Sequence, residues 1–135
     1  MGSPLIVRPL AGNTMGSAND AFVVAEWQDP GGPPGPPRLM APPHVHHRDD
    51  EAWYVLEGTL CVRVGDRVVE MAMGSGVFVP QRTPHTYWNP GPGRVRYLLI
   101  MTGNIFGLIN DIHSLSDRNR PALEAVFRKH DSELL

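Results

Sequence analysis

The sequence predicts an all-β sandwich or barrel with short helices at its C-terminal end. Short apolar segments follow one another closely over the first hundred residues, and glycine and proline separate them. This pattern is typical of an all-β fold and differs from the repeat of a βαβ fold. The segment Val64-Gly65-Asp66-Arg67 indicates a hairpin, because Gly65 and Asp66 tolerate the unusual backbone angles of a two-residue turn. After Thr102 the apolar residues recur at helical spacing instead.

The expected strands are short, and turn residues bound most of them. They are predicted over residues 22–27, 38–41 with a continuation to 46, 52–56, 59–64, 77–79, 86–88 and 95–101. The proline-rich stretch 30–37 is interpreted as a surface loop, because the thirty or so residues before it are too few to fold alone. We therefore expect a single domain over residues 1–135.

A helical tail is expected over residues 103–133, approximately, in the form of two short helices. Its apolar residues recur three or four positions apart, at Ile105, Ile109 and Ile112 and again at Leu123, Val126 and Phe127. Pro121 suits the first turn of the second helix, and Asn119 is the candidate cap of that helix. We expect both helices to pack outside the sandwich.

The composition restricts the partners and the location of the protein. A net charge of -2 argues against a nucleic acid or another polyanion as partner. The apolar run 5–7 is too short for a signal peptide or a membrane span, so no membrane partner is expected. Cys61 is the single cysteine, which excludes an intramolecular disulfide and favours a reducing compartment. We expect a cytoplasmic protein that binds a small molecule.

Three histidines and one glutamate have the spacing of a metal site. His44 and His46 are two residues apart, so they point to the same face if this segment is a strand. Glu51 follows a four-residue turn, and His85 must come from a distant hairpin. Mixed imidazole and carboxylate ligation suits divalent first-row metals and is too rich in nitrogen for calcium or magnesium. The expected cofactor is one ion of manganese, iron, cobalt, nickel, copper or zinc.

The segments around these residues resemble the two signature motifs of the cupin superfamily. Motif one is residues 42–58, which read PPHVHHRDDEAWYVLEG, and motif two is residues 74–89, with glycine, proline, histidine and asparagine at 74, 80, 85 and 89. The resemblance implies a jelly roll, which is a double-stranded β-helix sandwich. It also implies that the metal ligands are His44, His46, Glu51 and His85.

Motif two departs from the family pattern at Arg82, where glycine is usual. Glycine there allows a positive φ, so Arg82 must either bend the chain differently or accept strain. The gap of fifteen residues between Gly58 and Gly74 is typical of compact microbial cupins. The stretch 42–89 is further similar to single-domain cupins of the bacterial quercetinase type.

Strand alternation places several side chains beside the expected ligands. Trp53 and Val55 share the parity of Glu51, and Tyr87 shares that of His85, so all three should face the interior. Trp53 and Tyr87 then line an aromatic pocket for a flat substrate, or they simply fill the core. Further candidates for the lining are Met40, Val55, Phe78, Tyr97 and Met101. The histidines expected on the surface or on a helix face are His47, His113 and His130.

The favoured function is a metal-dependent dioxygenase of the quercetinase type that acts on a small aromatic or enolisable substrate. In this hypothesis Glu51 acts as a base and the hydroxyl of Tyr87 faces the substrate. One alternative is a zinc-type polyketide cyclase that promotes aldol cyclisation without oxygen. Another alternative is a binding protein without catalysis, whose helical tail engages a partner. A homodimer is expected, because a small open sandwich has strand edges and an apolar outer face to cover.

Overall fold

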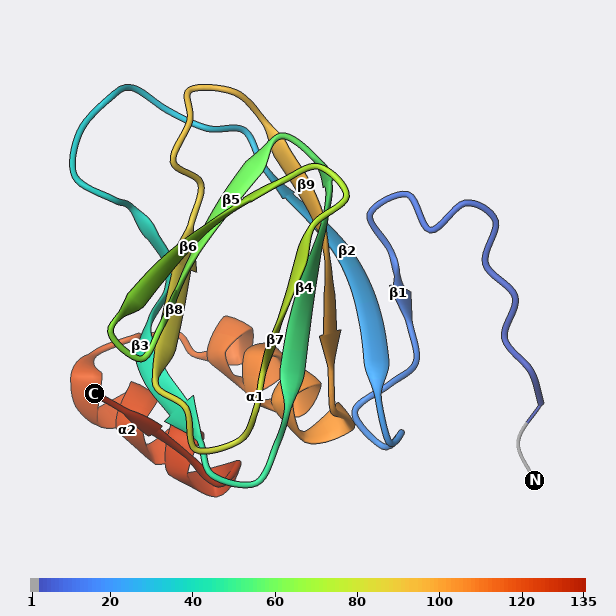
Figure 1. Ribbon diagram of the computed structural model, residues 1–135. Coiled ribbons are helices and arrows are strands. Elements are labelled where there is room, and N and C mark those ends of the chain that lie inside the picture. Colours follow the sequence, from blue (N-terminus) through green and yellow to red (C-terminus); the bar gives the residue numbers. More distant parts are fainter. Residues whose placement is uncertain (1–2) are drawn as a thin grey trace.

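A computed structural model describes residues 3–135 and contains two antiparallel sheets that face each other (Figure 1). The first sheet has the strand order β1 (Thr14–Met15), β2 (Val23–Asp29), β9 (Val95–Met101), β4 (Glu51–Glu57) and β7 (Gly76–Val79). The second has the order β10 (Ser132–Leu134), β3 (Leu39–His46), β8 (His85–Trp88), β5 (Thr59–Val64) and β6 (Arg67–Ala72). This arrangement confirms the predicted all-β jelly roll.

The core lies between the two sheets, and the alternation of buried residues along the strands creates it. In β9 every second residue is buried, from Val95 through Tyr97 and Leu99 to Met101. This strand pairs with β2 on one side and with β4 on the other, so its buried face continues across the sheet. Burial of such an apolar face is the main force that holds a sandwich together.

Gly65 and Gly58 are among the glycines with a positive φ, a conformation that other residues rarely adopt. Gly65 has a φ of 61° in the predicted hairpin, where Val64 pairs with Arg67. Gly58 has a φ of 81° between β4 and β5, and a side chain at this position would collide with the carbonyl oxygen of Arg94. Motif one therefore ends on a glycine because a side chain at position 58 would not fit.

Helices α1 (Gly103–Ser114) and α2 (Arg120–Lys129) follow β9, as the helical spacing predicted. Asn119 caps α2, because its side chain accepts a hydrogen bond from the backbone N–H of Ala122, and Pro121 lies in the first turn. The Thr102 side chain caps α1 in the same way, through the N–H of Ile105. In the described part of the chain, neither helix is long and apolar enough to cross a membrane.

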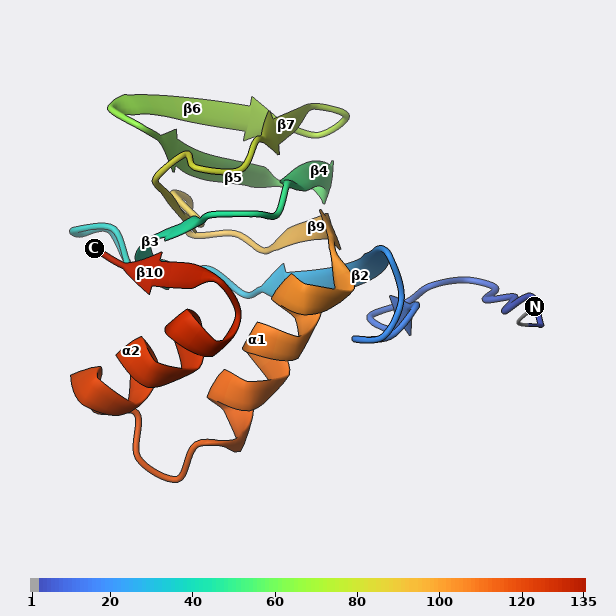
Figure 2. The same cartoon turned by 90° about the horizontal axis from the view of Figure 1, so that it is seen from below.

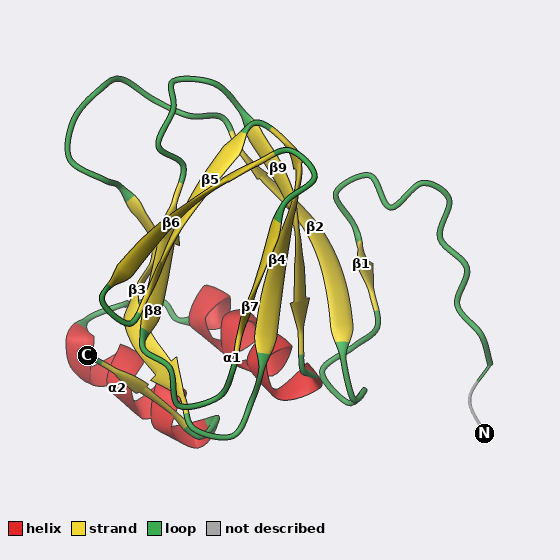
Figure 3. Cartoon of the chain, in the orientation of Figure 1, coloured by secondary structure: helices red, strands yellow, loops and turns green. Residues whose placement is uncertain are grey.

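The helices lie at one end of the sandwich, and the C-terminal strand returns to it (Figures 2 and 3). After α2 the chain reverses and forms β10, which pairs with β3 at the edge of the second sheet. Leu108, Phe127 and Leu134 form a separate apolar cluster between the helices and this strand. The helices are outside the two sheets, as expected, but they close one end of the sandwich as well. The strands β1 and β10 were not expected, because each has only two or three residues.

Candidate metal centre

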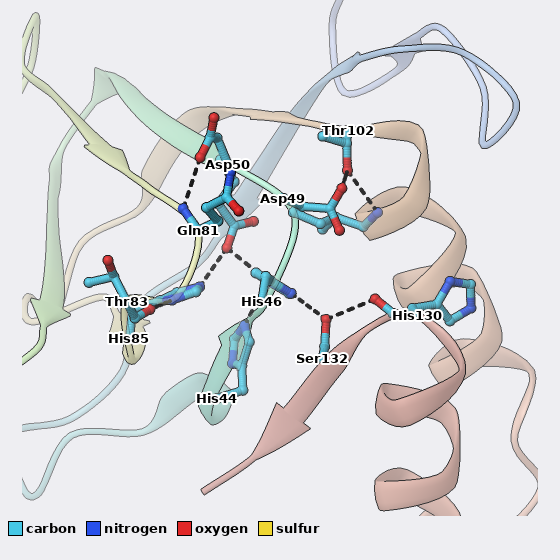
Figure 4. Close-up of polar contacts among 12 residues, drawn as sticks. His44, His46, Asp49, Asp50, Gln81, Thr83, His85, Thr102, His130 and Ser132 are labelled. Carbon is cyan, nitrogen blue, oxygen red and sulfur yellow. Dashed lines mark hydrogen bonds and ion pairs between the residues drawn. The ribbon is translucent and has the colours of Figure 1, made fainter.

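The four predicted ligands meet inside the sandwich. His44 and His46 lie on β3, Glu51 begins β4, and His85 begins β8. One potential ligand atom from each side chain lies within 4.8 Å of those of the other three, and all four side chains are buried. Figure 4 shows the three histidines pointing toward a common centre.

The strand pairing explains how distant segments supply one cluster. His44 lies directly opposite His85 in the ladder between β3 and β8, so these two imidazoles start from neighbouring strands of the second sheet. Glu51 belongs to the first sheet, where it lies opposite Met101 of β9 and Val79 of β7. The cluster therefore joins three imidazoles from one sheet with a carboxylate from the facing sheet.

Hydrogen bonds hold each imidazole in the orientation that a metal needs. The Nδ1 atom of each ring lies within hydrogen-bond distance of an oxygen away from the centre, which leaves the Nε2 atoms free to face one another. The partners are the carbonyl of Pro42 for His44 at 2.6 Å, the carbonyl of Thr83 for His85 at 2.9 Å, and the hydroxyl of Ser132 for His46 at 2.7 Å. A carbonyl oxygen only accepts, so Nδ1 of His44 and His85 carries the hydrogen and Nε2 is the metal-binding atom.

The inward-facing atoms have a spacing that suits one ion. The Nε2 atom of His46 lies 3.2 Å from that of His44 and 3.2 Å from Oε1 of Glu51, and the Nε2 atom of His85 lies 2.5 Å from the same oxygen. Two ligands that are each bound to one zinc-like ion are about 3.0–3.4 Å apart, which matches the two separations of 3.2 Å. The contact of 2.5 Å between His85 and Glu51 is a direct hydrogen bond, which a bound ion would replace. The imidazole and carboxylate donors also match the preference of divalent first-row metals. The residues present therefore fit a metal ion, whose identity the donor set leaves open.

The charges in the cluster favour the forms of the side chains that bind a metal. Burial alone would raise the pKa of Glu51, but hydrogen bonds from His46 and His85 lower it to about 2. Burial, together with the charges of His85 and His46, lowers the pKa of His44 to about 3. For His85, burial opposes protonation, but the hydrogen bond to Glu51, the charge of Glu51 and the hydrogen bond to Thr83 together outweigh it and raise the pKa. At neutral pH the cluster therefore offers an ionised carboxylate and a neutral His44.

Arg82 adopts the conformation that glycine usually provides in motif two. Its φ is 66°, which is the left-handed region that a residue with a side chain enters at a cost. The N–H of Arg82 donates to the carbonyl of His46 at 2.7 Å, and the N–H of Gln81 donates to Oδ1 of Asp50 at 2.8 Å. These bonds fasten the loop to the turn between β3 and β4. Of the two outcomes predicted for Arg82, the chain takes the strained one.

A cavity of about 480 Å³ leads to the cluster. His44, His46 and Glu51 lie in its wall, as do four residues that the sequence predicted for the lining, Met40, Trp53, Tyr87 and Tyr97. Most of the remaining wall is aliphatic or aromatic, and much of it comes from α1 and α2. This volume is within the range of sites for small organic molecules.

Three predicted lining residues do not line the cavity. Val55 and Met101 have the inward parity that was expected, but they pack within the core of the sandwich. Phe78 lies opposite Ala52 in the ladder between β4 and β7, next to the pair of Glu51 and Val79. Since neighbouring residues point to opposite faces, Phe78 faces away from the interior and is 62% exposed.

The helical tail supplies lining residues that the sequence prediction missed. Ile105, Leu108 and Phe127 are buried and line the cavity, whereas His113 and Arg118 are exposed and mark its rim. The helical periodicity indicated an apolar face for each helix, but nothing in it specified the surface that this face would cover. Ser132 was also missed, because a single serine near the end of a chain carries no recognisable pattern.

The other histidines lie away from the cluster. His47 is exposed beside Glu133, at 3.2 Å, as the strand parity predicted. His130 lies at the end of α2, where its ring contacts Asn104 at 2.9 Å and Asp111 at 2.7 Å. His113 is the exposed residue at the rim of the cavity.

An aromatic row runs from the cluster along the wall of the cavity. The ring centroid of Trp53 lies 5.6 Å from that of His85 and 5.2 Å from that of Tyr87, which in turn lies 6.0 Å from Tyr97. Burial raises the pKa of Tyr87 to about 12, so its hydroxyl carries a proton at neutral pH. Among the described residues, the buried indole N–H of Trp53 has no hydrogen-bond partner.

Comparison with protein families and curated proteins identifies the family of the chain. Residues 35–101, about half of the chain, match the cupin domain family. A mannose-1-phosphate guanylyltransferase of Sinorhizobium fredii is 29% identical over 118 residues, which are 87% of this chain and 22% of that protein. The corresponding enzyme of Salmonella typhimurium is 32% identical over 75 residues, which are 56% of this chain and 15% of that protein. The chain thus spans about a fifth or less of the length of these curated relatives.

Solved structures share the fold. The polyketide cyclase RemF from Streptomyces resistomycificus is 28% identical, with a TM-score of 0.50, over 62% of this chain and 56% of that chain. A putative sugar phosphate isomerase from Acidithiobacillus ferrooxidans is 25% identical, with a TM-score of 0.52, over 61% of this chain and 50% of that chain. A protein of Klebsiella pneumoniae with a double-stranded β-helix domain has a TM-score of 0.55 at 22% identity, which shows the fold alone.

Proposed function

Because this chain belongs to the cupin superfamily, we propose that it is a metal-dependent enzyme that enolises a small carbonyl substrate with an apolar or aromatic body. The observation that carries the proposal is the position of the His44, His46, Glu51 and His85 cluster at a cavity with a largely apolar wall. Such a wall favours a flat hydrophobic substrate and offers few partners for the hydroxyl groups of a free sugar.

The wall also has the polar groups that the chemistry needs. His44, His46, Glu51 and His85 would hold a divalent metal ion, which when bound acts as a Lewis acid toward a carbonyl oxygen. Glu51 is the only carboxylate among the described lining residues, so it is the candidate base. With a pKa near 2 it is a weak base while both His46 and His85 bond to it. Tyr87 keeps its proton and can donate a hydrogen bond to a substrate oxygen.

Enolisation is the step shared by two of the hypotheses drawn from the sequence. In the cyclase hypothesis the enolised carbon attacks a second carbonyl, and no oxygen is consumed. In a dioxygenase of the quercetinase kind the same activated anion reacts with oxygen. The 28% identity to the cyclase supports the reaction without oxygen as the first choice.

The experiment compares the two reactions on one preparation. The protein is purified without added metal, its metal is identified by elemental analysis, and it is incubated with an aromatic poly-β-ketone or a flavonol. Product that forms equally well in air and under nitrogen supports the cyclase, and product that requires and consumes oxygen supports the dioxygenase. Tight binding of these probes without turnover in either atmosphere would leave a binding protein and contradict the enzymatic proposal.

A sugar phosphate isomerase is the second candidate, and the rim of the cavity favours it. Arg118 and His113 are exposed there, and among the described residues Arg118 has no ion-pair partner. A phosphate group could bind these side chains while the carbonyl end reaches the metal cluster. Turnover of fructose 6-phosphate, reduced by an Arg118→Ala substitution, would support this candidate. Turnover of the aromatic probe with an unchanged rate in Arg118→Ala would support the first.

A further inference from the structure

The C-terminal strand β10 contributes to the metal cluster, although it lies outside residues 35–101 that match the family. We propose that Ser132 is a positioning residue of the metal centre: its hydroxyl fixes the tautomer and orientation of His46, so that metal retention depends on this strand. The inference rests on the metal-binding part of the proposed function and is independent of the reaction. Figure 4 shows Ser132 between the His46 ring and the backbone of His130.

The hydrogen bonds of Ser132 determine which atom of His46 carries the ring proton. The Oγ atom of Ser132 donates to the carbonyl oxygen of His130 at 3.2 Å, and this oxygen can only accept. The hydroxyl has one hydrogen, so it must accept from Nδ1 of His46, which lies 2.7 Å away. Nδ1 therefore carries a proton, and Nε2 is the ring atom that faces the cluster and is left for a metal ion. Both residues are 3% exposed, so water does not take over this role.

His46 differs from the other two imidazole ligands in where its support originates. His44 and His85 each bond to the carbonyl of the residue two positions earlier, so their own segments orient them. His46 bonds to a side chain that is 86 positions away in the sequence. Among the three imidazoles, His46 is therefore the one whose hydrogen bond comes from the C-terminal strand.

Several contacts hold the C-terminal strand at the distance that this bond requires. Ser132 lies directly opposite His46 in the ladder of β10 and β3. The N–H of His47 donates to the carbonyl of Asp131 at 2.9 Å, and the N–H of Leu135 donates to the carbonyl of Pro43 at 3.0 Å. Leu134 is buried in the cluster beneath the helices, which anchors the strand.

Asn104 connects this strand to the segment that carries Glu51. Its amide nitrogen donates to the His130 carbonyl at 2.8 Å and to Oδ2 of Asp49 at 2.7 Å. Asp49 lies in the turn between β3 and β4, two residues before Glu51. Asn104 therefore connects the His130 carbonyl, which accepts the hydrogen bond of Ser132, to the turn that precedes the ligand Glu51.

The test measures metal affinity and the tautomer of His46 in the full-length protein. Ser132→Ala removes the hydroxyl, Ser132→Thr keeps it, and Glu133→Ala changes the exposed neighbour on the same strand. Zinc affinity is measured by competition with a chelating dye, and the ring nitrogens of His46 are assigned by nitrogen-15 NMR on the metal-free protein. Loss of an outer hydrogen bond to a ligand weakens metal binding about 10- to 100-fold. We expect this loss in Ser132→Ala, little loss in Ser132→Thr, and none in Glu133→Ala.

The NMR readout separates positioning from a general structural effect. In the wild type the proton should reside on Nδ1, and in Ser132→Ala the two tautomers should mix. Weaker zinc binding with an unchanged His46 tautomer, or unchanged zinc binding in Ser132→Ala, would overturn the inference. A wild type that binds zinc but turns over no substrate contradicts the proposed reaction and leaves this inference standing.

Discussion

The ring of Phe127 packs edge-on against the ring of His44, with 5.4 Å between the centroids and an interplanar angle of 69°. A side chain of α2 is thus in direct contact with a residue of the metal cluster. Phe127 is also buried against Leu108 and Leu134 and lines the cavity. The helical tail therefore forms part of the site and is more than a covering of the sandwich.

Phe127→Ala should destabilise the protein and enlarge the cavity. Removal of a buried aromatic ring costs about 3–5 kcal/mol, because packing contacts are lost and a void remains. Urea unfolding of the metal-free protein measures this change. The matched control is Leu135→Ala, since Leu135 is apolar but 53% exposed, and its loss should cost much less. Equal effects of the two substitutions would contradict the position assigned to Phe127.

His85→Ala should lower the metal content sharply. Removal of a hydrogen-bond partner of a ligand costs about 10- to 100-fold in affinity, and removal of a ligand itself should exceed this. His47→Ala is the control, because His47 neighbours His46 in the sequence but lies outside the cluster. The metal content of the wild type, His85→Ala and His47→Ala is measured by elemental analysis after identical purification. The same metal occupancy in wild type and His85→Ala would refute the assignment of the ligands.

Tyr87→Phe should reduce turnover and leave the metal content unchanged. Burial keeps the Tyr87 hydroxyl protonated, so the substitution removes a hydrogen-bond donor from the cavity wall. Loss of one such bond to the substrate corresponds to about a 10-fold decrease in kcat/KM. The measurement is steady-state kinetics on the probe that the wild type converts, together with elemental analysis. Unchanged kinetics would assign Tyr87 to core packing.

The metal-free protein should lose stability in mild acid because of His44. Its pKa is lowered by burial and by the charges of His85 and His46 to about 3, whereas the unfolded chain has the ordinary value of 6.5. Below pH 6.5 the unfolded state therefore binds a proton that the folded state does not bind, and stability falls as the pH falls. His85 acts in the opposite sense. Its pKa is raised, so its contribution is present below the unfolded pKa and is lost as the pH rises through the folded value.

A comparison of two proteins isolates the contribution of His44. Between pH 6.5 and pH 5, the wild type should lose up to about 2 kcal/mol through this residue. His44→Leu should show a flatter dependence over the same range, since the titrating group is absent. The free energy of unfolding in urea, measured at several pH values with a chelator present, gives both slopes. Parallel curves would contradict the lowered pKa.

Arg82→Gly should stabilise the protein by about 1 kcal/mol, because a left-handed residue other than glycine is strained by this amount. The backbone bond from residue 82 to His46 does not involve the side chain and should persist. Thermal unfolding detects the change. Gly65→Arg is the reverse control. It places a side chain at another position with positive φ, so it should be destabilising. A less stable Arg82→Gly protein would mean that the arginine side chain has a role of its own.

The four residues of the metal cluster could be predicted from the sequence, but the cavity could not. His44, His46 and Glu51 are linked by strand alternation and a short turn, which are local features, and motif two supplied His85. The position of Phe78 depends instead on the register between β7 and β4, and sequence parity within one short strand does not define that register. The lining by Phe127 depends on where the helices pack after the chain reverses.

Arg82 and the outer face of the sandwich also separate what the sequence predicts from what only the structure provides. The sequence identified the unusual residue in motif two, and only the backbone angle showed that the strained conformation is kept. Tyr54 and Phe78 are exposed on the outer face of the first sheet. The homodimer that would cover them stays a prediction, which light scattering can check.

The facing positions of Glu51 and the three histidines have a consequence for the mechanics of the fold. An ion bound by all four side chains would link the two sheets directly. The sheets are otherwise joined by connecting loops and by apolar packing. Such a ligand stabilises the folded state by about 2.7 kcal/mol when its free concentration is 100 times the Kd. Removal of the ion should therefore let β4 separate from β3 and β8 more often, and amide exchange in these three strands should accelerate first.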